Sequence, residues 1–218
     1  MKKLKYIFLL AGALSLASCE SWLDEDPQYT INTKTQFSTV ENARQALMGC
    51  YGYMSADNAY GQAWQEVTFG YCGFGWSQTN GSSTDLLVSM DGGIDETINT
   101  MAWRGMYKVI GETNAFIANI ADSPLESADK LPMEAAARFL RALAYYNLAV
   151  TYGDVPLKTT PSAHDGVAVP RSPKNEVFEL VRTDWEFAYE NLPEKDDDGF
   201  ATKWAAKAYL GKLYHTLG

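Results

Sequence analysis

The sequence predicts an all-α fold built from antiparallel helix pairs, with a long aromatic and glycine-rich loop between two of the helices. Three observations support this prediction. Apolar residues recur at intervals of three and four over most of the chain, which is the spacing of one helix face. No stretch shows the sustained alternation of a half-buried strand, although residues 84–90 are a candidate for one short strand. Small residues gather in the last helical stretch, where they allow two helices to approach closely.

Capping and periodicity predict the first two helices. Ser38-Thr39-Val40-Glu41 has the pattern of a capping box, and it precedes a helix predicted over residues 39–54. The apolar stripe of that helix consists of Val40, Ala43, Leu47, Tyr51 and Met54. A second amphipathic helix is predicted over residues 95–121. Its stripe consists of Trp103, Tyr107, Ile110, Asn114, Ile117 and Ala121.

Three more helices complete the predicted fold. One begins near Pro132, which a first turn tolerates, and it ends before Gly153. It is predicted to be central because it is apolar on two faces. One face carries Phe139, Leu143, Tyr146 and Val150, and the other carries Leu140, Ala144 and Leu148. A fourth helix is predicted to begin at Ser172-Pro173, with Ser172 as its N-cap and Pro173 at its first position. The last helix is predicted over residues 201–217. The string Leu210-Gly211-Lys212-Leu213-Tyr214 matches part of the tetratricopeptide pattern, but Trp204 is six residues before Leu210 and the pattern places a Trp three before it. The string therefore supports antiparallel helix pairs without establishing a regular repeat.

Composition and charge exclude some classes of protein. The chain has 218 residues, of which 46% are hydrophobic and 21% charged, so it should fold around a core and is neither a disordered segment nor a polytopic membrane protein. The net charge is -9, and Lys and Arg cluster only at the N-terminus. This balance argues against nucleic acid as a partner, because binding to phosphates needs clustered cations. The informative excess is aromatic, with 6 Trp and 13 Tyr.

The first 18 residues are predicted to be a lipoprotein signal peptide. Three lysines precede an apolar run over residues 7–17, which is too short to span a bilayer permanently. The run ends in Leu16-Ala17-Ser18-Cys19, which resembles the lipobox of bacterial lipoproteins. Cys19 is therefore the predicted lipid attachment site, residues 19–37 a tether, and residues 38–218 the helical domain. The alternative is an ordinary secretory signal in which Cys19 is incidental.

Several segments together resemble one known family. Residues 135–148, followed by Tyr152-Gly153-Asp154-Val155-Pro156-Leu157, are similar to the hallmark segment of the SusD/RagB outer-membrane nutrient-binding lipoproteins of Bacteroidota. Further similar pieces occur in the order seen in the family. They are the lipobox, Trp22-Leu23-Asp24-Glu25-Asp26-Pro27, Asn114-Ala115-Phe116-Ile117 in the second long helix, Arg171-Ser172-Pro173, and Asn191-Leu192-Pro193.

The resemblance implies a fold, a location and partners. It implies a tetratricopeptide-like helical scaffold, a lipid anchor in the outer membrane, and display at the cell surface. It also implies capture of oligosaccharides for a SusC-like TonB-dependent transporter. Family members are much longer than this chain, and their C-terminal half helps to build the ligand site. The resemblance therefore implies that the chain corresponds to the N-terminal helical region of the family.

The predicted loop contains the candidate ligand-binding residues. Aromatic residues alternate with glycines from Tyr60 to Trp76, and amides and hydroxyls follow. Sugars stack their C–H faces on rings and need hydrogen-bonding partners for their hydroxyls. The candidate ligand contacts are Trp76, Asn80, Trp64, Gln78 and Tyr60. The alternative for each ring is that it anchors the loop on the helices. Asp85 either contacts the ligand or caps a backbone amide.

No motif indicates an enzyme, a cofactor or a metal site. His164 and His215 stand alone, and no H-E-x-x-H motif is present. Residues 194–199 resemble part of a calcium loop, but Ala205 stands where a bidentate Glu is required. Cys50 and Cys72 either form a disulfide or stay free. Besides glycan binding, two functions stay open: a protein–protein adaptor of the cell envelope, and an exported hydrolase with an unrecognised pair of carboxyl groups.

Overall fold

The computed structural model describes residues 33–70, 72, 75, 83–91, 97–161 and 169–218. The predicted signal peptide and the lipid attachment site Cys19 lie outside these residues, as do Trp76, Gln78 and Asn80. Within the described ranges, no helix is both long enough and apolar enough to cross a bilayer.

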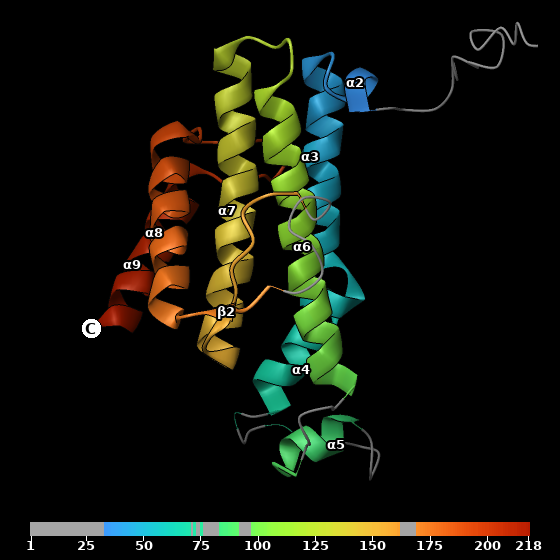
Figure 1. The fold of residues 1–218 in the computed structure, drawn as a ribbon, viewed down its shortest axis with the longest axis vertical. Helices are drawn as coiled ribbons and strands as arrows, with labels where there is room; N and C mark the ends of the chain where they lie inside the picture. Colours follow the sequence, from blue (N-terminus) through green and yellow to red (C-terminus); the bar gives the residue numbers. More distant parts are fainter. Residues whose placement is uncertain (1–32, 71, 73–74, 76–82, 92–96, 162–168) are drawn as a thin grey trace, which may run out of the picture. The chain divides into compact units, whose positions relative to one another are not determined.

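Helices dominate the described part of the chain (Figure 1). The long helices are α3 (Val40–Ser55), α6 (Thr97–Ala121), α7 (Ser127–Tyr152), α8 (Lys174–Asn191) and α9 (Lys203–Leu217). The shorter ones are α2 (Thr33–Gln36), the π-helix η2 (Asp57–Gly61), α4 (Ala63–Gly70) and α5 (Ser83–Val88). Two short strands, β1 (Val155–Pro156) and β2 (Arg171–Ser172), pair antiparallel, with Val155 opposite Ser172.

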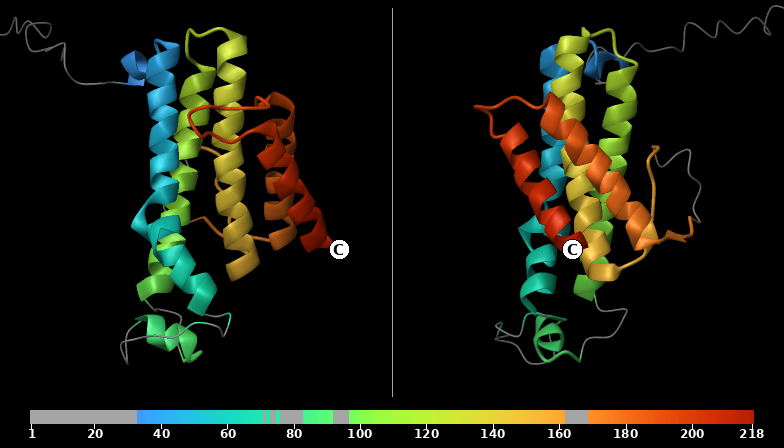
Figure 2. Two further views of the ribbon diagram at one scale, coloured as in Figure 1. Left: turned by 180° about the vertical axis from the view of Figure 1, so that it is seen from behind. Right: turned by 90° about the vertical axis from the view of Figure 1, so that its left-hand side faces the viewer.

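Consecutive long helices pack against each other and alternate in direction (Figure 2). Helix α7 lies between α6 and α8, α9 packs on α8, and α3 packs on both α6 and α7. The predicted antiparallel, tetratricopeptide-like helix pairs are therefore confirmed. The prediction that α7 is central is also confirmed, because most of its side chains between Met133 and Ala149 are buried. These side chains form the middle of the core. The prediction is wrong for Val150, which lies in the last turn of α7 and is exposed.

Helix α3 differs from the prediction in its cap and in its buried face. The N-cap is Thr39, whose hydroxyl accepts a hydrogen bond from the Asn42 N–H at 3.2 Å, so the capping box does not begin at Ser38. Val40 is exposed, whereas Cys50 is buried with Ala43, Leu47 and Met54. The buried stripe therefore lies slightly to one side of the predicted one, because it faces both α6 and α7.

Helix α7 begins earlier than predicted. It starts at Ser127, so Pro132 lies inside the helix and not at its first position. Its end agrees with the prediction. Gly153 has φ 75°, a backbone conformation that glycine adopts without a steric penalty, and its N–H donates to the Ala149 carbonyl at 3.2 Å. Helix α8 begins at Lys174, whose N–H donates to the Asp154 carboxylate at 2.8 Å. Asp154 therefore caps α8, where Ser172 was expected to do so.

The predicted aromatic loop is partly helical. Its first residues end η2, and the next form α4. The strand considered for residues 84–90 is wrong, because Ser83–Val88 is the helix α5. A short apolar run fits a strand or a buried helix equally well, and packing decides between them. Leu87 is fully buried, and a Cβ at Gly70 would lie 2.6 Å from the Leu87 Cβ, so α4 and α5 meet in close contact.

The folded region begins before the predicted domain boundary at residue 38. Helix α2 precedes that boundary, and the Phe37 ring is buried. It contacts the Phe116 ring edge-on, with centroids 5.4 Å apart. The end of the predicted tether, residues 33–37, is therefore part of the helical unit.

Candidate functional site

Arg141 joins three helices inside the core. Its Nε and Nη2 atoms donate to the two carboxylate oxygens of Asp184 on α8, each at 2.8 Å. Its Nη1 donates to the side-chain oxygen of Asn114 on α6 at 2.9 Å. Two parallel bonds between a guanidinium and a carboxylate are stronger than neutral hydrogen bonds and fix the orientation of both groups. The arginine therefore sets how α6, α7 and α8 meet.

The same polar cluster holds the connector that follows α7. The Asn114 amide donates to the carbonyls of Lys158 and Thr160 at 3.0 and 3.2 Å. The Tyr145 hydroxyl donates to the Lys158 carbonyl at 2.8 Å and accepts from the Lys158 N–H at 2.6 Å. Side chains of α6 and α7 thus supply hydrogen-bond partners for the backbone of this connector. The motif residues Arg141, Tyr145 and Asn114 therefore have structural roles.

Tyr60 and Trp64 come together against the helical core. The Tyr60 hydroxyl accepts a hydrogen bond from the Asn147 amide on α7 at 2.7 Å. Burial raises the pKa of the Tyr60 hydroxyl, and the bond from Asn147 offsets part of that rise. The Trp64 side chain is only 8% exposed, and its ring centroid lies 6.4 Å from that of Tyr60. Of the two roles predicted for these rings, the structure favours anchoring over stacking on a ligand.

The other predicted site residues fall in different places. Trp76, Gln78 and Asn80 lie outside the described residues. Asp85 lies in the first turn of α5. The structure therefore brings two of the five predicted ligand contacts, Tyr60 and Trp64, close to each other, and the ligand role of all five stays a prediction.

A surface hollow of about 460 Å³ lies where η2 meets α6. It is lined by Tyr53, Ala56, Asn58, Arg104, Gly105 and Lys108. A Cβ added at Gly105 would lie 1.9 Å from the carbonyl oxygen of Asn58, so only glycine allows α6 to approach the π-helix this closely. Ala59 has non-helical backbone angles, φ -121° and ψ -122°, which turn the chain inside η2. Sequence reasoning missed this site because the close approach depends on packing.

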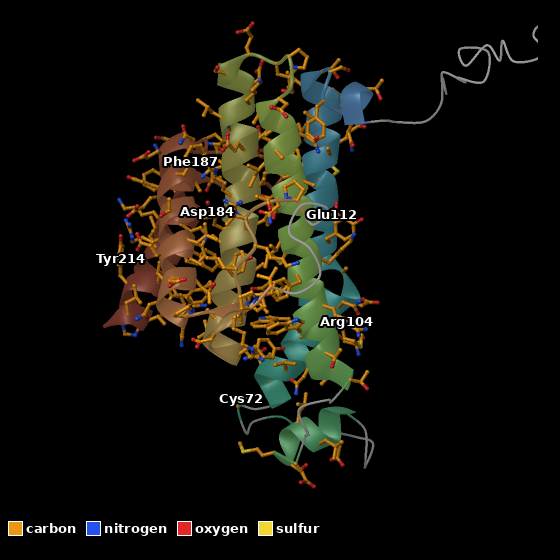
Figure 3. All side chains as sticks on the ribbon, viewed as in Figure 1. Cys72, Arg104, Glu112, Asp184, Phe187 and Tyr214 are labelled. Carbon is orange, nitrogen blue, oxygen red and sulfur yellow. The ribbon has the colours of Figure 1, made fainter. Side chains whose placement is uncertain are left out.

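Two cations from one face of α6 line the hollow. Arg104 and Lys108 are four residues apart, which places them one turn from each other. The Lys108 ammonium lies 2.6 Å from the Glu112 carboxylate and 4.7 Å from the centre of the Tyr53 ring. The bond to Glu112 raises the pKa of Lys108. Arg104 is exposed, and none of the described residues pairs with it. Figure 3 labels Arg104 and Glu112 along α6.

The acidic turn over residues 194–199 binds a guanidinium of the protein itself. Arg44 Nη2 lies 3.1 Å from the Asp196 carboxylate, and Arg44 Nε donates to Asp198 at 2.8 Å. Asp196 also accepts from the backbone N–H groups of Asp198 and Phe200. In the part of the chain that is described, no group of three His, Cys, Asp or Glu side chains could hold a metal ion.

Both described cysteines are free. Cys50 is buried in α3, and Cys72 is exposed. Burial, and to a smaller extent the charge of Glu112, raises the pKa of the Cys50 thiol to about 12. The sequence left open whether Cys50 and Cys72 form a disulfide or stay free, and in the structure they are free. The Cys50 thiol therefore lacks the lowered pKa that is typical of a reactive cysteine.

Residues 21–215 match the model of the SusD-like family whose description is starch-binding associating with outer membrane. One curated relative, SusD-like protein P25 of Formosa agariphila, is 26% identical over 223 residues. The matched region covers 96% of this chain and 42% of that relative. The chain thus spans less than half the length of the curated relatives that it matches.

Two solved structures that resemble the chain involve sugars. A laminarin-binding SusD-like protein is 26% identical with a TM-score of 0.67, over 82% of this chain and 40% of that protein. A second structure, with xylogluco-oligosaccharide, is 26% identical with a TM-score of 0.66, over 78% of this chain and 34% of that one.

Proposed function

Because the chain belongs to the SusD-like family, we propose that it is a surface-exposed, lipid-anchored glycan-binding protein that captures oligosaccharides for a SusC-like TonB-dependent transporter. The observation that carries the proposal is the family match over residues 21–215. The similar laminarin-binding protein and the structure with xylogluco-oligosaccharide support a glycan as the ligand. We assign binding and no catalysis, in keeping with a family that is described by what it binds.

The proposed sugar contacts follow in the sequence the part of the chain that Tyr60 and Trp64 pack onto the core. Trp76 would stack on the C–H face of a sugar ring, and the amides of Gln78 and Asn80 would bond its hydroxyls. Tyr60 and Trp64 would support this segment through their packing and through the bond from Asn147. A ligand site held by packed neighbours loses less entropy when the ligand binds.

Replacing Trp76 tests the proposed contact. Trp76→Ala should weaken oligosaccharide binding about tenfold, which corresponds to roughly 1.4 kcal/mol, and Asn80→Ala should weaken it less. Trp204→Ala is the matched control, because Trp204 is an exposed tryptophan on α9. Calorimetry against a glycan panel would measure both variants, and circular dichroism would check their helix content. If both variants bind oligosaccharides with the same affinity, Trp76 has a packing role, and the alternative function as a protein–protein adaptor is favoured.

The lipid anchor has its own test. Cys19→Ala should release the protein from membranes and abolish metabolic labelling with palmitate, because stable anchoring depends on the buried acyl chains. Unchanged retention in the membrane fraction would contradict lipidation at Cys19.

The transporter partnership is tested by purification. Tagged protein taken from outer membranes in mild detergent should carry a TonB-dependent transporter with it. Purification of the lipoprotein alone, under conditions that preserve other outer-membrane complexes, would contradict the partnership and leave glycan binding standing.

A further inference from the structure

We propose that the hollow between η2 and α6 binds an anionic group on a glycan, either a uronate carboxylate or a sulfate ester; this inference rests on the proposed glycan-binding function. It adds a second contact to the proposed stacking site and narrows the ligand to acidic glycans.

The charge around the hollow is the first argument. The chain carries a net charge of -9, yet the two charged side chains that line this hollow are both cationic. Glu112 neutralises Lys108, whereas Arg104 keeps its charge without an ionic partner among the described residues. An anion entering the hollow would therefore meet the Arg104 guanidinium, which has no ionic partner among the described residues, beside the Lys108 ammonium, which is shared with Glu112.

The shape of the guanidinium is the second argument. An arginine presents its N–H donors in a planar fork that matches the two oxygens of a carboxylate or sulfate. Lysine adds a compact charge one helical turn away. The Asn58 side chain, which also lines the hollow, can donate to or accept from a sugar hydroxyl. The residue types thus suit a charged group attached to a hydroxyl-rich ring.

The walls of the hollow are the third argument. Its volume of about 460 Å³ lies within the usual range for small-ligand sites. Tyr53 is 38% exposed and offers an aromatic wall for the apolar face of a sugar. The backbone of Gly105 packs directly against Asn58, because glycine has no side chain that would separate them. Both cations lie on α6, so the helix keeps them at a fixed spacing.

A lipid phosphate would offer similar anionic chemistry, so the test must separate the two sources. Calorimetry would compare an oligogalacturonate with a neutral laminarin oligosaccharide of the same length, using the full chain. A third arm would measure binding of vesicles that contain phosphatidylglycerol. Arg104→Gln removes the positive charge at this position, and Arg104→Lys keeps the charge but lacks the planar fork of N–H donors. Lys207→Gln is the matched control, because Lys207 is an exposed cation on α9.

The expected result is selective loss of the acidic ligand. Arg104→Gln should weaken oligogalacturonate binding by about tenfold or more, and Arg104→Lys should weaken it less. Neither variant should change binding of the neutral oligosaccharide, and Lys207→Gln should leave both ligands unaffected. Raising the salt from about 50 to 500 mM should weaken only the acidic ligand, since exposed charges are screened.

Four results would overturn the inference. In the first, the protein binds the neutral oligosaccharide as tightly as the oligogalacturonate. In the second, Arg104→Gln and Lys207→Gln have the same affinity for oligogalacturonate. Either result would contradict the anionic site and leave the proposed function intact. Vesicle binding that depends on Arg104, without an effect on the acidic glycan, would reassign the hollow to lipid headgroups. Failure of both oligosaccharides to bind would overturn this inference, whereas the proposed function would fall only if no glycan of a wider panel binds.

Discussion

Arg141 on α7 and Asp184 on α8 form a bidentate ion pair with almost no access to solvent. Both N–O distances are 2.8 Å, and the exposed fractions of the two side chains are 6% and 0%. Arg138 lies 3.5 Å from the same carboxylate, and Asn114 accepts the remaining bond from Arg141. The buried charges are therefore compensated within a network that spans three helices, and each member depends on the others.

Removing the carboxylate should destabilise the fold strongly. Asp184→Ala leaves the Arg141 guanidinium buried without its partner, and such a loss costs about 3 to 5 kcal/mol. Urea titration followed by circular dichroism would measure the free energy of unfolding. Glu179→Ala is the control, because it removes an exposed carboxylate that pairs with Arg182 on the same helix, and it should shift the midpoint little.

A double substitution separates the effect of the orphaned charge from that of lost packing. Arg141→Met combined with Asp184→Leu removes both charges and keeps apolar bulk, so it should destabilise the protein less than Asp184→Ala alone. A double variant at least as unstable as Asp184→Ala would mean that the network matters for more than charge compensation.

The central helix offers a test of core packing. Leu143 is 8% exposed and lies in the middle of α7, so Leu143→Ala should lower the free energy of unfolding by about 2 to 5 kcal/mol. Val150→Ala near the end of the same helix should change it by no more than about 0.5 kcal/mol, because Val150 is exposed. A loss below about 1 kcal/mol for Leu143→Ala in denaturant titration would contradict the assigned burial.

The close contact between α6 and η2 depends on Gly105, which has no side chain. Gly105→Ala would place a methyl group 1.9 Å from the Asn58 carbonyl oxygen, so η2 must move and the hollow must change shape. Gly211→Ala on α9 meets nothing within 4 Å and should stabilise its helix by about 0.5 to 1 kcal/mol. Thermal unfolding of both variants would compare them. Equal stability of the two would show that the close approach at Gly105 is not required.

The two described cysteines should differ in reactivity. In a Cys19→Ala background, Cys72 should react with a thiol reagent at pH 8, whereas Cys50 should react only after unfolding. The pKa of Cys50 is raised from an ordinary value of 9.0 to about 12, so the folded state holds this proton more tightly than the unfolded state. Its contribution to stability is complete below pH 9 and is lost as the pH rises towards 12. Labelling of Cys72→Ser at the rate of unfolded protein would contradict the burial of Cys50.

The helices were predictable because local signals and burial agree along them. In α7, apolar residues on two faces and the stop at Gly153 gave both the helix and its central position. The buried face of each helix was less predictable than the helix itself, because the sequence pattern does not show which other helices pack against it. On α6 the predicted stripe included Trp103 and Tyr107, which are only half-buried, whereas Met106 and Val109 fill the core.

Contacts between distant residues could not be predicted from the pattern. Asp184 looks like an ordinary polar position on α8, and its partner Arg141 is far away along the chain. The hollow was missed for the same reason, because Arg104 and Lys108 have the spacing of a solvated helix face and Gly105 has no side chain to mark the contact. Trp64, chosen as a ligand contact because it is aromatic, is as well suited to the core.

The most direct test of the central claim is a binding measurement on the unmodified chain. Calorimetry against laminarin, xyloglucan and starch oligosaccharides should show saturable binding to at least one of them. We expect a dissociation constant near millimolar or lower, which corresponds to about -4 kcal/mol or more favourable. Absence of saturable binding to every glycan tested, by protein whose helical circular dichroism is intact, would contradict the claim that this chain binds glycans.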